Sequence, residues 1–235
     1  MSTSPCQISM VKDVRVCGCL LVAIPLFSLI VLAHHPTVTA SNLHGVGHEL
    51  SSAALAAKVV HGTLIAMQCA LLYAFSSWLI TRNLQRAIPR ATGIMLMLGV
   101  IGVIGAALVD GFVVSPVSSY PHDGDPSLFV MGQLLRFAMT LNQVLILAGE
   151  LALSAAFALL SIDLFGLNRE GRFLGALGLL LGIGSLVALL SGWLTLQLHG
   201  MQFLFAAQSM WMLCFGIFML RLPEALLRRE SFPLK

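Results

Sequence analysis

Six long stretches of the chain are continuously apolar, and the polar and charged residues are concentrated between them. A helix needs about 20 mostly apolar residues to cross the hydrocarbon core of a bilayer. Because the apolar runs are continuous and do not alternate with polar residues, they predict helices and not barrel strands. The sequence therefore predicts an all-α fold, a polytopic transmembrane helical bundle that forms one domain over residues 1–235. The predicted spans are residues 17–33, 53–80, 91–115, 137–162, 173–198 and 202–220.

Composition supports a membrane protein and limits its partners. Of the 235 residues, 58% are hydrophobic and only 10% are charged, whereas soluble domains carry roughly 25% charged residues. The lipid bilayer is therefore the expected surrounding. The net charge of +3 is small and the basic residues are scattered, which argues against a nucleic-acid partner. The five cysteines show no metal-finger spacing and predict no disulfide framework.

The distribution of basic residues predicts the orientation. If six spans are crossed, eleven of the thirteen Lys and Arg residues fall on one side, with Lys58 and Arg136 as the exceptions. Short cytoplasmic loops are enriched in basic residues, so both termini are expected in the cytoplasm (N-in/C-in), in a bacterial inner membrane or its equivalent. An alternative remains open. Residues 38–40 resemble a signal-peptide cleavage site, and cleavage there would leave five spans.

Histidines are concentrated on the opposite, non-cytoplasmic side. With this topology all seven lie on that side or at its membrane boundary, where they could bind a metal ion or respond to pH. His44 and His48 are spaced i and i+4, which places both on one face of a helix in a geometry that can chelate a metal. The alternative is a solvated pair in a loop. A metal ion at the outer histidines is the cofactor that the sequence suggests.

Three ionisable residues are expected at one depth near the non-cytoplasmic rim. Counting 1.5 Å per residue from the basic loops places His61, Asp110 and Arg136 at similar heights on spans two, three and four. Together they could form a partly hydrated pocket. Ordinary snorkelling of each side chain to the interface is the alternative.

Span four carries a polar stripe that is expected to face the bundle interior, because lipid offers no hydrogen-bond partners. The stripe consists of Gln133, Arg136, Thr140, Gln143, Glu150, Ser154 and Ser161. Glu150 counts to the bilayer midplane, where an ionised carboxylate is costly and should be paired or protonated. Gln68 and Ser185 count to a similar depth and are its expected partners. Glu150 is the strongest single functional candidate, with an interhelical structural bond as the alternative.

Small residues predict where helices approach closely. Gly99, Gly102 and Gly105 recur at three-residue steps in span three, and Gly178 and Gly182 are four residues apart in span five. Such spacing lets the backbones of two membrane helices come into contact.

No catalytic or nucleotide-binding motif is present, so three functional hypotheses stay open. The first is binding or transport of a small molecule or ion through a pocket with His61, Asp110, Arg136, Gln143, Gln68 and Glu150. The second is a membrane-embedded enzyme, with or without a metal, acting on a lipid or apolar substrate at the outer leaflet. The third is an accessory or structural subunit of a homo- or hetero-oligomer.

Overall fold

The structure, a computed structural model, describes residues 5–35, 43–81, 86–114, 127–196 and 198–221. Over these residues it is helical with short turns and contains no strand. The helices are α1 (Pro5–Ala33), α2 (Leu43–Ser52), α3 (Ala54–Thr81), α4 (Ala87–Leu108), the π-helix η1 (Val109–Val114), α6 (Ser127–Leu164), α7 (Arg169–Leu190) and α8 (Leu198–Arg221).

Among the described residues, six helices are long and apolar enough to cross a membrane, the same number as the spans that the sequence predicts. They cover Val11–Ala33, Ala54–Ile80, Ala87–Val114, Phe129–Leu164, Arg169–Leu190 and Gly200–Arg221. The fourth span begins eight residues before the predicted start at 137. The fifth ends at Leu190 and not at 198, because Gly192 adopts a positive φ of 75° and Leu194 N–H donates back to the Ala188 carbonyl at 3.0 Å.

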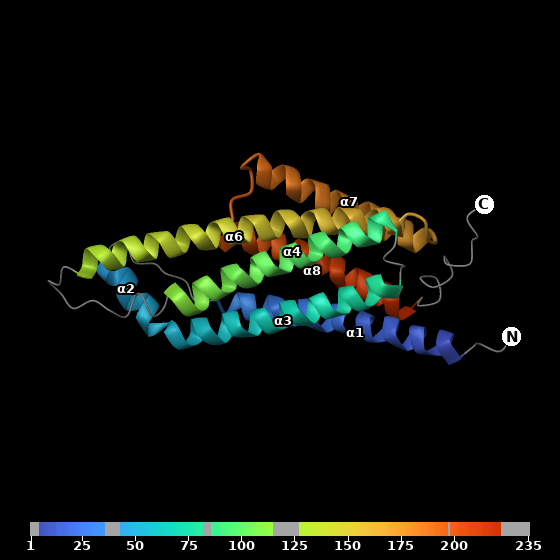
Figure 1. The fold of residues 1–235 in the computed structure, drawn as a ribbon, viewed down its shortest axis with the longest axis horizontal. Coiled ribbons are helices and arrows are strands. Elements are labelled where there is room, and N and C mark those ends of the chain that lie inside the picture. The colour runs from blue at the N-terminus through green and yellow to red at the C-terminus, as the bar shows by residue number, and fades with distance from the viewer. Residues whose placement is uncertain (1–4, 36–42, 82–85, 115–126, 197, 222–235) are drawn as a thin grey trace.

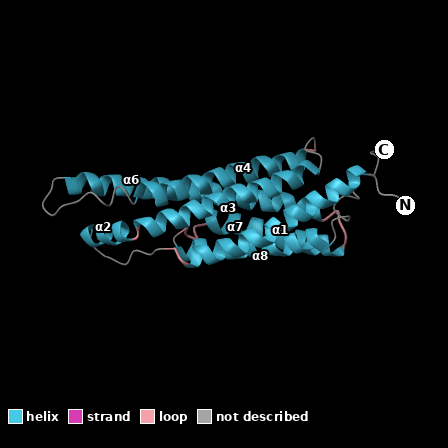
Figure 2. Ribbon diagram, turned by 90° about the horizontal axis from the view of Figure 1, so that it is seen from below, coloured by secondary structure: helices cyan, strands magenta, loops and turns pink. Residues whose placement is uncertain are grey.

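The helices run roughly along one common axis (Figures 1 and 2). The start of α1 and the end of α8 lie at the same end of the bundle, at the right of Figure 1. The short helix α2 lies at the opposite end, near the start of α3 and the start of α6. That opposite end carries His35, His61 and Asp110 and is called the histidine end below.

Glycines bring α4 and α6 into backbone contact, as their spacing predicts. A Cβ atom on Gly102 would lie 2.7 Å from the Cα of Gly149, and one on Gly99 would lie 2.6 Å from the Cγ of Leu153. Gly182 in α7 meets the backbone of α6 at Ser154 and Ala158 in the same way, whereas Gly178 faces the side chains of Ser161 and Trp211. Because the two backbones touch, α4 holds η1 at a fixed position beside α6.

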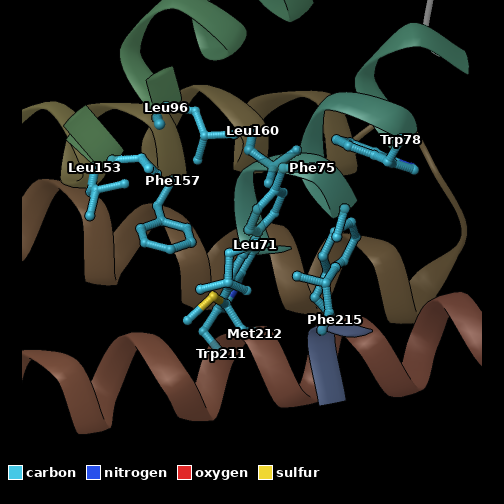
Figure 3. Packing of buried hydrophobic residues seen from close by; sticks show 14 of the residues in the cluster. Leu71, Phe75, Trp78, Leu96, Leu153, Phe157, Leu160, Trp211, Met212 and Phe215 are labelled. Carbon is cyan, nitrogen blue, oxygen red and sulfur yellow. The ribbon is translucent and has the colours of Figure 1, made fainter. Parts of the chain in front are cut away.

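Aromatic side chains fill the bundle between the histidine end and the ends of α3 and α8 (Figure 3). Trp78 of α3 meets Phe215 of α8 edge to face at a centroid distance of 5.3 Å, and Phe157 of α6 meets Trp211 of α8 at 5.1 Å. Along α3 the buried members of this core begin at Leu71, three residues after Gln68, whereas along α4 they continue to Ala106. The bundle is therefore tightly packed along α3 beyond Leu71.

Candidate functional site

A cavity of about 560 Å³ lies at the histidine end. It is surrounded by side chains from α1, α2, α3, α4, η1, α6 and α8. Most of its wall is apolar, with residues such as Leu64, Ile104 and Phe205. The polar side chains that line it are His35, Glu49, His61, Gln68, Asp110, Asn142 and Gln143. Its volume and its apolar wall with few polar groups are typical of sites for small organic molecules.

Three of these polar side chains form one compact cluster. The Nε2 atom of His61 lies 3.1 Å from Oδ2 of Asp110 and 3.2 Å from Nε2 of His35. The third side of the triangle, from His35 Nε2 to Asp110 Oδ2, measures 3.7 Å. The two imidazole rings meet edge to face at a centroid distance of 5.0 Å. Residues from α3, η1 and the segment that follows α1 thus direct three potential ligand atoms at one point.

The orientation of His61 is fixed by its own helix. Its Nδ1 atom lies 2.7 Å from the carbonyl oxygen of Ala57, one turn earlier in α3, so Nδ1–H is the donor of that hydrogen bond. In a neutral imidazole this leaves Nε2 with a lone pair, which is directed toward Asp110 and His35. His61 is 4% exposed, so water does not compete freely for this position.

Asp110 owes its position to a local irregularity. It lies in η1, where the helix widens after α4, and π-helical turns of this kind are frequent at functional sites. Gly111 then permits the close approach, because a Cβ atom there would lie only 2.5 Å from the Cβ of His61. The sequence of η1 therefore brings the carboxylate of Asp110 within reach of α3.

The structure separates the residues that sequence depth had grouped. It brings His61 and Asp110 together, but Arg136 is exposed and does not line the cavity. Gln143 and Gln68 both line the cavity, although Gln143 is largely exposed and Gln68 is buried. The member that completes the cluster is His35. Sequence analysis counted it only among the seven histidines of the non-cytoplasmic side, because residue counts along separate helices do not show which helix ends are neighbours.

Of the predicted pair His44 and His48, only the side chain of His48 is described, and it does not belong to the cluster. Both lie in α2. The side chain of His48 is exposed, and that of His44 lies outside the described part of the structure. The side chains of His122 and His199 and the proposed cleavage site at 38–40 also lie outside the described residues.

The polar stripe of α6 faces the interior over only half its length. Glu150, Ser154 and Ser161 are buried, whereas Gln133, Arg136 and Thr140 are exposed. The expectation of a fully inward stripe is therefore wrong for its first turns. The reason is that α6 begins at Ser127 and extends beyond the neighbouring spans at the histidine end (Figure 1).

Glu150 is fully buried, and its partner is a residue that sequence analysis missed. Oε2 accepts a hydrogen bond of 2.7 Å from the side-chain amide of Gln208 in α8, and not from the expected Gln68 or Ser185. Its other oxygen, Oε1, has no hydrogen-bond partner among the described residues. Depth alone could not select Gln208, because several helices carry a polar group at that height.

A small chamber lies between the large cavity and this buried acid. It has a volume of about 20 Å³, enough for about one water molecule. Ser28, Gln68, Gln208 and Ser209 are its polar lining residues. Gln68 lines both the chamber and the large cavity, and Gln208 lines the chamber and binds Glu150. Glu150 itself lines neither space.

Comparison with known proteins finds no matching protein family, no similar characterised protein and no similar solved structure. The chemistry of the cavity and its cluster is therefore the basis for assigning a function. That chemistry is a largely apolar cavity of molecular size whose wall carries the His35, His61 and Asp110 cluster and one further carboxylate, Glu49.

Proposed function

We propose that this chain is a six-span membrane protein that binds a small, largely apolar molecule in the cavity at the histidine end. The observation that carries the proposal is the cavity of about 560 Å³, whose apolar wall bears the His35, His61 and Asp110 cluster. An apolar body would displace water from the wall, while a polar end group would contact the cluster. With both termini in the cytoplasm, as the basic residues predict, the site belongs to the non-cytoplasmic half of the membrane.

The lining favours a small organic molecule over a hydrated ion. Ion pathways are lined by carbonyl groups or by rings of charged side chains, whereas most of this wall is aliphatic or aromatic. The aromatic core beyond Gln68 also fills the bundle toward the opposite end. These features support a binding site that is accessible from one half of the membrane. Movement of the molecule across the membrane would require that core to rearrange.

The proposal also includes Glu150, the buried acid that counts to the membrane centre. The chamber places Gln68 and Gln208 between the cavity and Glu150. We infer that a water molecule in this chamber connects the cavity with the buried carboxyl group. Replacing Glu150 by Gln keeps the size and one acceptor oxygen but removes the carboxyl group's ability to take up and release a proton. Any proton movement linked to ligand binding in reconstituted vesicles should then be lost.

Photolabelling tests the binding site directly. The probe is a medium-chain alcohol that carries a diazirine, added to the purified full-length chain, with labelled residues identified by mass spectrometry. Ala107→Phe fills the cavity, since Ala107 lines it. Leu108→Phe is the matched control, because its neighbour Leu108 is 46% exposed and is not a lining residue.

Labelling of lining residues should fall in Ala107→Phe and persist in Leu108→Phe. Labelling of lipid-facing residues such as Leu180, which is 73% exposed, should be equal in both. Equal labelling of the cavity in the two variants, or labelling confined to the lipid-facing surface, would refute the proposed site.

A further inference from the structure

We infer that His35, His61 and Asp110 bind one divalent transition-metal ion, in a zinc-type tetrahedral site whose fourth position opens into the cavity. The three ligand atoms lie within 4.8 Å of one another. The metal site stands on this geometry alone. The further statement that the ligand's polar end coordinates the ion rests on the proposed function.

The spacing of the three atoms matches tetrahedral coordination. An ion with bonds of about 2.0 to 2.1 Å holds its ligand atoms about 3.3 to 3.4 Å apart. The three distances here are 3.1, 3.2 and 3.7 Å, and they scatter around that value. An ion displaced by about 0.6 Å from the plane of the three atoms would make three bonds of about 2.05 Å. Little movement of the side chains would be needed.

One cation would satisfy all three polar atoms at once. In neutral His61, whose Nδ1–H is committed to the Ala57 carbonyl, the Nε2 lone pair faces the carboxylate of Asp110, and two acceptors at 3.1 Å repel each other. A metal ion between them removes this repulsion, since each of the three atoms can then donate a lone pair to it.

The donor set selects the class of metal. Two imidazole nitrogens and one carboxylate oxygen suit zinc or another first-row transition ion, whereas calcium and magnesium prefer oxygen ligands only. The hydrogen bond from His61 to Ala57 is the outer-shell contact that metal-binding histidines usually make. All three side chains line the cavity, so the remaining coordination position is available to a molecule bound there.

An open position on a metal defines the polar end of the ligand more closely. Two neutral imidazoles and one carboxylate leave a divalent ion with a net charge of +1. An oxygen donor such as a carboxylate, an alkoxide or hydroxide completes such a shell. The cavity is therefore suited to an amphiphile with an apolar body and one metal-binding oxygen group. The same arrangement is what a metal-dependent enzyme acting on an apolar substrate would need.

Metal titration tests this inference. The full-length chain is purified in detergent, stripped with a chelator and titrated with Co²⁺ and then Zn²⁺. We expect one Co²⁺ per chain with the strong visible absorption of a four-coordinate site, and displacement by Zn²⁺. His35→Gln, His61→Gln and Asp110→Asn should each weaken binding by more than about 100-fold, beyond the loss that outer-shell changes cause. His48→Gln is the matched control, because His48 is exposed and outside the cluster.

The titration of the wild-type chain tests the metal site even if a variant does not fold. No binding to the stripped wild-type chain would overturn the metal site, as would binding that is lost in His48→Gln and retained in Asp110→Asn. Diazirine labelling of the stripped protein keeps the two proposals distinguishable. Labelled cavity residues without metal binding would refute the metal alone, and metal binding without cavity labelling would refute the proposed ligand site alone.

Discussion

Gly111→Ala is the substitution that probes most sharply how the fold builds the site. The new Cβ atom would lie 2.5 Å from the Cβ and 2.8 Å from the Cγ of His61. Unstrained carbon atoms stay about 3.5 to 4.0 Å apart, so η1 and α3 must separate by about 1 Å. That movement would lengthen the 3.1 Å contact between His61 and Asp110 to about 4 Å, beyond the spacing that one tetrahedral ion can hold. Metal affinity should fall at least about tenfold, because such sites tolerate displacements of only about 0.5 Å.

Gly62→Ala is the matched control, since Gly62 adjoins His61 on α3. Its Cβ atom would meet only Phe112, at an ordinary contact distance of 3.7 Å. Both substitutions gain about 1 kcal/mol of helix propensity, so their difference in thermal stability isolates the clash. Overpacking should make Gly111→Ala less stable than Gly62→Ala by about 1 to 3 kcal/mol. Co²⁺ titration and thermal unfolding in detergent measure the two effects. Unchanged metal affinity in folded Gly111→Ala would refute this account of how the site is held.

Three further substitutions test the packing, the buried acid and the predicted pocket residue that the structure leaves outside. Gly102→Ala would place a Cβ atom against the backbone of α6 and should lower the free energy of unfolding by about 1 to 3 kcal/mol. Gly184→Ala is the control, because its Cβ atom would enter open space and should not lower stability. Equal melting temperatures of the two variants would contradict the close helix contact. Gln208→Leu removes the 2.7 Å hydrogen-bond donor of Glu150 and should lower the free energy of unfolding by about 1 to 3 kcal/mol. The double variant with Glu150→Leu should be closer in stability to the wild type. Additive losses in thermal unfolding would argue against the pair. Arg136→Gln should leave Co²⁺ affinity and cavity labelling unchanged, because Arg136 is exposed and does not line the cavity. A large change in either measurement would show that Arg136 belongs to the site.

The sequence was sufficient to predict the long apolar helices because the membrane imposes a simple rule. Backbone polar groups must be satisfied within each span, so long apolar runs become helices. Small residues at regular spacing identified α4 as a helix that another backbone approaches closely, but they did not show that this neighbour is α6. The ends of the spans were less certain. The end of α7 depends on the conformation of Gly192, which apolar content does not reveal.

The site was only partly predictable for a geometric reason. Counting residues gives the height of a side chain along the membrane normal, and this placed His61 near Asp110 and Glu150 in the interior. It does not give the rotation of each helix or the identity of its neighbours. For that reason the predicted pocket included Arg136, and His35 was not recognised as the third member of the cluster.

The partner of Glu150 was missed for the same reason. Gln68 and Gln208 both carry amide groups near the middle of a span, but only the packing of α8 against α6 brings Gln208 to the carboxyl group. The π-helical turn in η1 is a further feature that no residue pattern in Val109–Val114 predicted.

X-ray absorption at the zinc edge of the Zn²⁺-loaded chain tests the central claim most directly, because it reports the atoms around the ion. We predict a first shell of nitrogen and oxygen atoms at about 2.0 to 2.1 Å, with scattering from two imidazole rings in the wild type and from one in His35→Gln. A shell that contains sulfur, a shell of six oxygen atoms, or a spectrum that His35→Gln leaves unchanged would contradict a metal centre made by His35, His61 and Asp110.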